Sequence, residues 1–300
     1  MTEINSSIGA VRAFWDANPC GHDLSDNHER RAYFAEIERR RYSHEPHIPA
    51  VALFDSFRGK RVLEIGNGMG TDGLQFQQNG AEYFGVDLTL AGQKLAREQF
   101  SLAGHAARLI VANAERLPVA DNSFEHIYSL GVIHHSPSTE SIVSEMSRVL
   151  KPGGTFCVMV YNRSSINYHL EIMFLRKLFR RLLYPKVMPG ILAAVLRFDR
   201  EKLEKHRDAL FSKGRISKAE WISMNTDGPD CPLAKVYGRR DVLKLFARFE
   251  DLKTEVLFFD RSHWSFLGRL MPDAVANFLG RRWGWHRMVY GRKPATPSDG

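Results

Sequence analysis

The residues best suited to chemistry lie in one short stretch, residues 61–73, which reads RVLEIGNGMGTDG. A strand-like apolar run is followed by three glycines at alternate positions, Gly66, Gly68 and Gly70. Glycine lets the main chain turn through positive φ and lets a ligand approach without meeting a side chain. Glu64 stands two residues before the first glycine. The pattern indicates a strand, a loop and a helix that hold a nucleotide-type ligand.

The spacing of the glycines distinguishes between ligands. A dinucleotide fingerprint, G-x-G-x-x-G, requires its last glycine at the position of Thr71. The pattern here is E-x-G-x-G-x-G, which resembles motif I of the class I S-adenosylmethionine-dependent methyltransferases. The resemblance implies that the cofactor is S-adenosyl-L-methionine and that Asn67 and Thr71 help the glycines to hold it. It also implies that Glu64 orders the loop, although a carboxylate here is equally able to cap the following turn.

A second strand-like run, EYFGVDL, places Asp87 seventeen residues after Gly70. A carboxylate at the carboxyl end of that strand can accept hydrogen bonds from both ribose hydroxyls of a nucleoside. The alternative is an ordinary turn carboxylate at the end of a strand. The resemblance further implies that Leu88 packs on one face of the adenine.

Two later stretches continue the resemblance in the family's order. Residues 112–135 resemble its third and fourth motifs, and residues 148–161 resemble the helix, turn and strand that follow. The residues that this implies beside the cofactor are Asn113, Ala114, Glu115 and Leu130. Many relatives carry aspartate where this chain has Asn113, but an amide carbonyl still accepts from the adenine amino group.

Candidate catalytic groups follow the fourth and fifth predicted strands. The phosphoethanolamine methyltransferases use a catalytic histidine at what looks like the position of His134. We therefore expect His134 to be the base, with His135 second and Tyr161 third. Adjacent residues point in different directions, so one histidine can face the cavity while the other satisfies a helix N-terminus. No metal site is expected.

The composition restricts the class of protein. Three hundred residues, 44% of them apolar, suffice for one large domain with insertions or for two small ones. No apolar run reaches 18 residues and the first residues lack a signal-peptide pattern, so we expect a cytoplasmic protein. Three widely spaced cysteines favour neither a disulfide framework nor a zinc site.

The net charge of +8 raises the question of nucleic-acid binding. The basic pairs occur in separate segments, which is typical of solvated helices. The loop that marks base N-methyltransferases, Asn/Asp-Pro-Pro-aromatic, is absent after the fourth strand. We therefore expect no nucleic-acid partner, and the oligomeric state is unknown.

The expected fold is α/β, a Rossmann-like seven-stranded sheet with helices on both faces. The predicted parts are an N-terminal helical cap (1–59), the cofactor-binding core (60–161), a helical insertion or lid (162–236), C-terminal strands and helices (237–294) and a disordered tail (295–300). The last two strands are expected at 254–260 and 285–293.

The insertion opens with a basic amphipathic segment, residues 166–183. Such a helix either lies on a membrane surface or covers a substrate pocket with its apolar face. We expect the second, with membrane attachment as the less favoured alternative.

The resemblance implies methyl transfer to the O, N or C of a small, apolar or amphiphilic acceptor. The sulfonium is already activated, so the protein supplies alignment, desolvation and, where the acceptor needs it, a base. Two alternatives stay open: a regulatory protein that binds S-adenosylmethionine or a nucleoside without methylation, and a nucleic-acid methyltransferase.

Overall fold

The computed structural model describes residues 7–196, 200–211, 216–261, 268 and 270–295. The expected disordered tail lies outside these residues except for Ala295. The strands are β1 (Arg61–Ile65), β2 (Glu82–Asp87), β3 (Leu109–Val111), β4 (Phe124–Leu130), β5 (Leu150–Asn162), β6 (Val236–Tyr237), β7 (Glu250–Leu257) and β8 (His286–Arg292).

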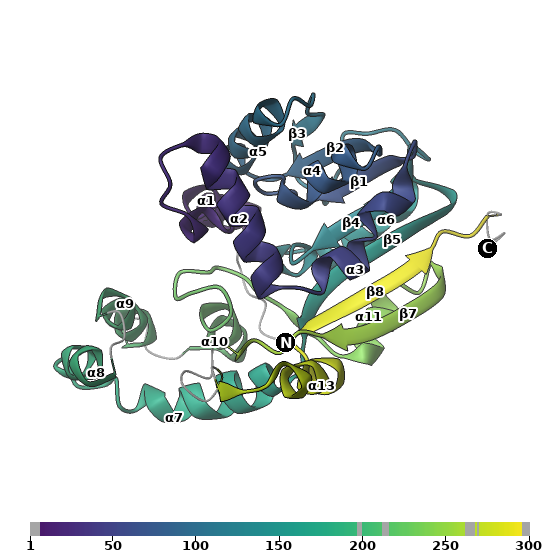
Figure 1. Ribbon diagram of the computed structural model, residues 1–300. Coiled ribbons are helices and arrows are strands. Elements are labelled where there is room, and N and C mark those ends of the chain that lie inside the picture. Colours follow the sequence, from purple (N-terminus) through teal and green to yellow (C-terminus); the bar gives the residue numbers. More distant parts are fainter. Residues whose placement is uncertain (1–6, 197–199, 212–215, 262–267, 269, 296–300) are drawn as a thin grey trace.

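Within the described residues the strands form one sheet in the order β3-β2-β1-β4-β5-β8-β7, and the two-residue β6 pairs with β5 (Figure 1). The first five strands are parallel, whereas β8 runs antiparallel between β5 and β7. The expected Rossmann-like sheet is confirmed, with β6 as an additional short strand. The predicted run at 254–260 is displaced, because β7 begins at Glu250 and ends at Leu257.

Helices connect the parallel strands and cover both faces of the sheet. Those of the core are α4 (Thr71–Gln78), α5 (Leu90–Leu102), α6 (Thr139–Val149), α11 (Arg239–Leu245) and α13 (Asp273–Trp283). One face of the sheet packs against Ile142, Val143 and Met146 of α6. The other face packs against a cluster that includes the buried rings of Phe76 and Tyr83. A parallel sheet joined by helices has the carboxyl ends of its strands at one edge, where ligands bind in such folds.

Three N-terminal helices lie before the sheet: α1 (Ile8–Ala17), α2 (Arg30–His44) and α3 (Ile48–Ala52). Arg30 holds the start of α2 to α5 through a two-bond ion pair with Glu98, at 2.5 and 2.7 Å. Asp16 ties α1 to the same helix by accepting a hydrogen bond from the backbone N–H of Ala91. Figure 1 shows α1 and α2 beside α5. The cap is thus fixed to the sheet through α5.

The insertion after β5 forms a separate group of helices that projects from the sheet (Figure 1). It comprises a π-helix (Asn167–Leu175), α7 (Arg176–Arg180), α8 (Met188–Leu196), α9 (Arg200–Phe211) and α10 (Lys218–Met224). Its own core includes Ile172, Leu183 and Trp221.

The first half of the insertion leaves large apolar side chains in contact with solvent, among them Phe174, Leu178 and Tyr184. Membrane attachment through residues 166–183 stays a prediction. In the part of the chain that the structure describes, no helix is long and apolar enough to cross a membrane.

The close approach of α4 to β2 gives a test of the fold. A Cβ on Gly73 would lie 2.2 Å from the ring of Tyr83, so Gly73→Ala forces a fully packed core apart. We expect the free energy of unfolding to fall by about 3 kcal/mol in urea denaturation. Gly9→Ala is the matched control. Gly9 is exposed on α1, and a Cβ added there would have no neighbour closer than 3.6 Å. It should be neutral or stabilising by up to ~1 kcal/mol, and equal losses in the two variants would contradict the packing argument.

Candidate active site

The glycine loop follows β1 and leads into α4. Gly66, Gly68 and Gly70 all have positive φ, at 78°, 48° and 82°. A Cβ on Gly66 would lie 2.3 Å from the side chain of Val132, and one on Gly70 would lie 3.0 Å from Ala96. A Cβ on Gly68 would meet nothing within 4 Å. Two of the glycines therefore permit close packing, and the third leaves room for a ligand against the main chain.

A cavity of about 510 Å³ lies between this loop and the N-terminal helices. Its lining joins the carboxyl ends of the parallel strands to α1, α2 and the start of β8. Seven acidic residues line it, against one basic residue of permanent charge, Arg41: they are Asp23, Glu45, Glu64, Asp72, Asp87, Asp227 and Asp260. In a chain of net charge +8, such a lining favours a positively charged ligand.

Most of the predicted cofactor residues line this cavity. They are Glu64, Gly66, Asn67, Gly68, Thr71, Asp87, Leu88, Asn113, Ala114 and Leu130. Gly70 and Glu115 are absent from the lining. Gly70 packs on α5 instead. Glu115 accepts hydrogen bonds from Ser136 Oγ and Ser138 N, so it orders the loop after β4.

Asp87 has a second role that the sequence pattern did not indicate. Its carboxylate accepts hydrogen bonds from the backbone N–H of Gly68 at 2.8 Å and from the backbone and hydroxyl of Thr89. A carboxylate offers about four acceptor positions, so roughly one is left for a ribose hydroxyl. Asp87 therefore holds the glycine loop in place as well as facing the cavity.

Glu64 is buried beneath the loop and accepts a hydrogen bond from the hydroxyl of Tyr83 at 2.6 Å. Burial raises its pKa to about 8; the negative charge of Asp72 adds to this rise, and the hydrogen bond from Tyr83 opposes it. At neutral pH this carboxyl group therefore largely keeps its proton. An approaching cation would favour its ionised form.

A buried ion pair connects the cap to the loop helix. Arg41 on α2 donates to both carboxylate oxygens of Asp72 on α4, at 3.0 and 2.7 Å. The hydroxyls of Tyr42 and Tyr128 donate to the same carboxylate, each at 3.0 Å. Sequence reasoning missed this pair, because Arg41 ends a run of three arginines that resembles a solvated helix face.

His135 presents one ring nitrogen to the cavity. Its Nδ1 lies 2.6 Å from the carbonyl oxygen of Leu233, which can only accept, so Nδ1 carries the proton and Nε2 has the free lone pair. Nε2 lies 3.7 Å from Oδ2 of Asp227. Both atoms are buried and have no hydrogen-bond partner in the described chain. The hydroxyl of Tyr161 donates to the other oxygen of Asp227 at 2.7 Å.

His134 lies on the other side of the short helix Ile133–His135. Its side chain is fully buried, is absent from the cavity lining and packs 4.0 Å from the ring of Tyr161. Burial lowers its pKa well below the usual range, and the nearby His135 acts in the same direction. The structure thus does not support His134 as the first choice for a base, because the tight turn directs only His135 into the cavity.

The helices of the insertion do not line this cavity, but the last part of the predicted 162–236 insertion does, and a lid role for the helices stays a prediction. Among the described residues 163–225 none lines it, and the loop that follows supplies Thr226 and Asp227. The apolar side chains of the insertion pack on one another or remain exposed. Asp227 belongs to the polar segment TDGPDCP, residues 226–232, and no sequence motif assigned it a role.

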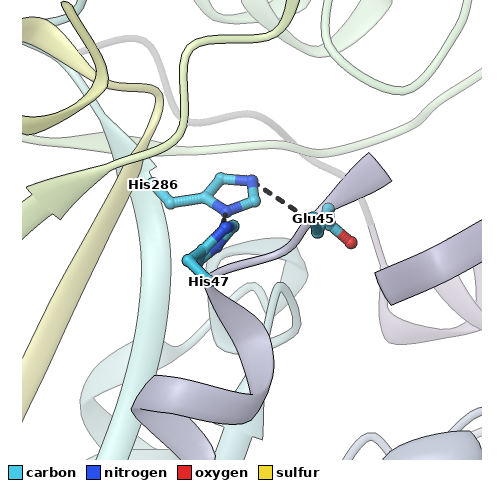
Figure 2. Close-up of side chains that lie close together, drawn as sticks. All are labelled: Glu45, His47 and His286. Atoms are coloured by element: carbon cyan, nitrogen blue, oxygen red, sulfur yellow. Dashed lines mark hydrogen bonds and ion pairs between the residues drawn. The ribbon is translucent and has the colours of Figure 1, made fainter. Parts of the chain in front are cut away.

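Two histidines and a carboxylate come together after α2, and two of these residues, Glu45 and His286, line the cavity (Figure 2). Glu45 and His47 flank the turn between α2 and α3, and His286 begins β8. The Nε2 atom of His47 lies 3.0 Å from Nδ1 of His286, and Nε2 of His286 lies 3.5 Å from Glu45. His47 and His286 lie 239 positions apart in the chain, and no sequence pattern indicated that they would meet.

Comparison with known protein families agrees with this geometry. Residues 63–158 match the family model described as "Methyltransferase domain". The match begins in β1 and ends in β5, and so contains the glycine loop, Asp87 and His135. The centre of this chain is a class I methyltransferase domain.

Two curated relatives of the methyltransferase domain carry specific names. The phthiotriol/phenolphthiotriol dimycocerosates methyltransferase of Mycobacterium leprae is 31% identical over 172 residues, which cover 55% of this chain and 62% of the relative. The fatty-acid O-methyltransferase of Mycolicibacterium smegmatis is 33% identical over 121 residues, 40% of this chain and 43% of the relative. The matched stretches thus span less than two thirds of these relatives.

Solved structures share the fold. The phosphoethanolamine N-methyltransferase 2 of Haemonchus contortus, solved with S-adenosylhomocysteine, superposes with a TM-score of 0.54 at 16% identity. The superposition covers 96% of this chain and 60% of that one. At this identity the likeness supports the fold alone.

The Arg41–Asp72 pair gives the prediction for the site. Arg41→Met leaves a carboxylate that is 3% exposed without its charged partner, so we expect the free energy of unfolding to fall by about 3–5 kcal/mol. Arg39→Met on the same helix is the control, because the Arg39 side chain is 70% exposed and its loss should cost less than ~0.5 kcal/mol. Urea denaturation measures both. The double variant with Asp72→Asn should recover part of the loss, and no recovery would show that the pair does not carry the effect.

Proposed function

We propose that this chain binds S-adenosyl-L-methionine at the glycine loop and transfers its methyl group to the O, N or C of a small, apolar or amphiphilic acceptor. The observation that carries the proposal is a single cavity in which a glycine loop at the carboxyl edge of the sheet meets two unpartnered acceptor atoms, His135 Nε2 and Asp227 Oδ2. The matched methyltransferase domain supports the same conclusion.

The lining fits this cofactor. The space beside Gly68 is open, the Asp87 carboxylate faces the same cavity, and the acidic lining suits a ligand that carries a sulfonium and an ammonium group. The side chains of Leu88, Leu130 and Ile142 offer apolar contacts for an adenine. When bound, this cofactor supplies an activated methyl group.

The cavity also has apolar and aromatic walls. Its lining includes Val11, Trp15, Ile37, Phe258 and Trp285. Sites with such walls and a few fixed polar groups bind apolar or amphiphilic molecules. The names of the curated relatives, a phthiotriol/phenolphthiotriol dimycocerosates methyltransferase and a fatty-acid O-methyltransferase, support an acceptor of this kind.

His135 is the group placed to take a proton from the acceptor. The hydrogen bond from Nδ1 to Leu233 keeps the lone pair on Nε2, and the edge of Trp15 packs on the ring at 5.1 Å. An ammonium between Nε2 and Asp227 would donate to both buried acceptors at once, and a hydroxyl would donate to one of them. After the proton moves to Nε2, the carboxylate of Asp227 stabilises the imidazolium.

Tyr161 holds Asp227 in this arrangement. Burial raises the pKa of the Tyr161 hydroxyl well above its usual range, and the negative charge of Asp227 acts in the same direction. The hydroxyl therefore stays protonated and donates to Asp227, while its ring stacks on Trp285 at 4.5 Å. In this arrangement Tyr161 positions the carboxylate and is no longer a candidate base.

The two alternative functions have less support. A regulatory protein that only binds the cofactor would not need an unpartnered histidine and carboxylate in the same cavity. A nucleic-acid methyltransferase would need an open basic surface at the site, whereas the lining here is acidic. The matched relatives named for lipid and fatty-acid substrates favour neither alternative.

The role of Asp87 in binding is testable by titration calorimetry. Asp87→Asn removes the charge and places an amide beside the donors of Gly68 and Thr89, so the affinity for S-adenosylmethionine should fall by about two powers of ten. Because Asp87 also holds the loop, unfolding should become easier by about 1–2 kcal/mol. Asp208→Asn, at a side chain that is 71% exposed, should change neither quantity. An unchanged affinity, or tighter binding of NAD than of S-adenosylmethionine, contradicts the assignment.

The base is tested by turnover. With a panel of long-chain alcohols, phenols and carboxylic acids as acceptors, His135→Gln should lower kcat by ~10²–10⁴-fold, and the affinity for S-adenosylmethionine should stay within about threefold. Asp227→Asn should lower kcat to a smaller extent, because Nε2 keeps its lone pair but loses the stabilising charge. His169→Gln is the control, since His169 is exposed on the insertion. A loss of less than about tenfold in His135→Gln would exclude His135 as the base.

A further inference from the structure

The cluster of Glu45, His47 and His286 connects the N-terminal cap with the C-terminal strand β8. Glu45 and His47 belong to the turn between α2 and α3, and His286 is the first residue of β8, opposite Tyr161 on β5. Figure 2 shows the two imidazole rings with their nitrogens directed at one another and Glu45 beside His286. Glu45 and His286 also line the cavity.

The distances suit a common ion. One ligand atom from each residue lies within 4.8 Å of those of the other two. Imidazole nitrogens and carboxylate oxygens bind zinc at about 2.0–2.2 Å, so two ligands of one ion lie about 3–4 Å apart. Nε2 of His47 and Nδ1 of His286 are already 3.0 Å apart. Glu45 contacts the other nitrogen of the His286 ring, Nε2, at 3.5 Å. To share an ion with Nδ1, the Glu45 side chain must therefore rotate toward His47.

The ligand types also restrict the metal. Two imidazoles and one carboxylate form a site for borderline divalent metals such as zinc, whereas magnesium and calcium take oxygen ligands.

The surroundings hold the rings in place. Phe258 packs against His47 at 5.3 Å and against His286 at 4.6 Å, so the two rings share one apolar wall. Arg41 lies 3.5 Å from the other oxygen of Glu45, which leaves the oxygen nearest His286 for an ion. The 3.0 Å contact between the rings contains one N–H, and that proton must move to the second nitrogen of the same ring before both nitrogens can bind a metal.

We propose that Glu45, His47 and His286 form a binding site for one divalent transition-metal ion of the zinc type, with a free coordination position toward the cavity. Three protein ligands and an open position are the arrangement of catalytic zinc sites. The ion would lie at the wall of the cavity, beside Trp285.

The consequence for the substrate class rests on the proposed function. An ion in this place would bind an oxygen of the acceptor, such as a carboxylate, a phenol or an enol, and would lower the pKa of a hydroxyl bound to it. The acceptor would then be an oxygen-bearing molecule whose polar end meets the metal while its apolar part lies against the aromatic walls.

A second cluster in the same cavity serves as the internal comparison. His135, Asp227 and Cys231 also bring ligand atoms within 4.8 Å of one another. Burial and the charge of Asp227 raise the pKa of the Cys231 thiol to about 12, although Nε2 of His135 keeps its lone pair. This cluster therefore lacks a ready thiolate, and we assign the ion to the histidine pair.

Zinc titration of the tag-free, chelator-treated full chain tests the proposal without any acceptor. Calorimetry should give one equivalent of tightly bound Zn²⁺, and Co²⁺ in its place should give the visible absorption of a low-symmetry nitrogen–oxygen site. His47→Gln and His286→Gln should each weaken Zn²⁺ binding by more than about a hundredfold, because removal of a direct ligand exceeds the 10–100-fold typical of indirect partners. Circular dichroism confirms that the variants fold.

Two control variants give the outcomes that decide the matter. His44→Gln, next to the cluster but paired with Asp260 at 3.3 Å, and Cys231→Ser, in the second cluster, should each change the affinity by less than about threefold. The proposal is overturned if the native chain binds no Zn²⁺. It is also overturned if binding is lost in Cys231→Ser and kept in His286→Gln. Because S-adenosylmethionine affinity is measured separately, a failure of the metal site is distinguished from a failure of the proposed methyl transfer.

Discussion

The buried carboxylate of Asp72 is the interaction on which the site depends. It receives four hydrogen bonds, two from Arg41 and one each from Tyr42 and Tyr128, and so joins α2, α4 and β4. A carboxylate that is 3% exposed is stable only with such partners. The cap is therefore held over the carboxyl edge of the sheet, and the space left between cap and sheet is the cavity. This pair acts together with the contacts through α5 that hold α1 and α2 in position relative to the glycine loop.

The charge of the cavity follows from the same arrangement. The chain as a whole carries a net charge of +8, yet its cavity lining has seven acidic residues. Burial raises the pKa of Glu64 to about 8, and the negative charges of Asp72 and Asp87 act in the same direction. The same field favours both a cationic cofactor and a metal ion. Cofactor binding, proton uptake by His135 and the inferred metal site thus share one electrostatic environment.

The core of the fold was predictable because it depends on local pattern. Short apolar runs ending in glycine or aspartate marked β1 and β2, and the alternate glycines of the loop reflect backbone angles that other residues rarely adopt. Most of the predicted cofactor residues belong to these strand ends, and a parallel sheet brings strand ends together whatever else the chain does. The assignment of Glu115 and Gly70 to the cofactor stays a prediction, because Glu115 accepts a hydrogen bond from Ser136 and a Cβ on Gly70 would meet α5.

The sequence by itself determined the Rossmann-like sheet, the glycine loop and the position of Asp87, since each follows from residues close together in the chain. The tertiary structure alone decided which of two adjacent histidines faces the cavity, because the turn of a short helix separates His134 from His135. It also brought Asp227 to His135 and His286 to His47, across 92 and 239 positions. Pairings over such distances depend on how the cap and the C-terminal strands pack on the sheet, and no local pattern records that packing.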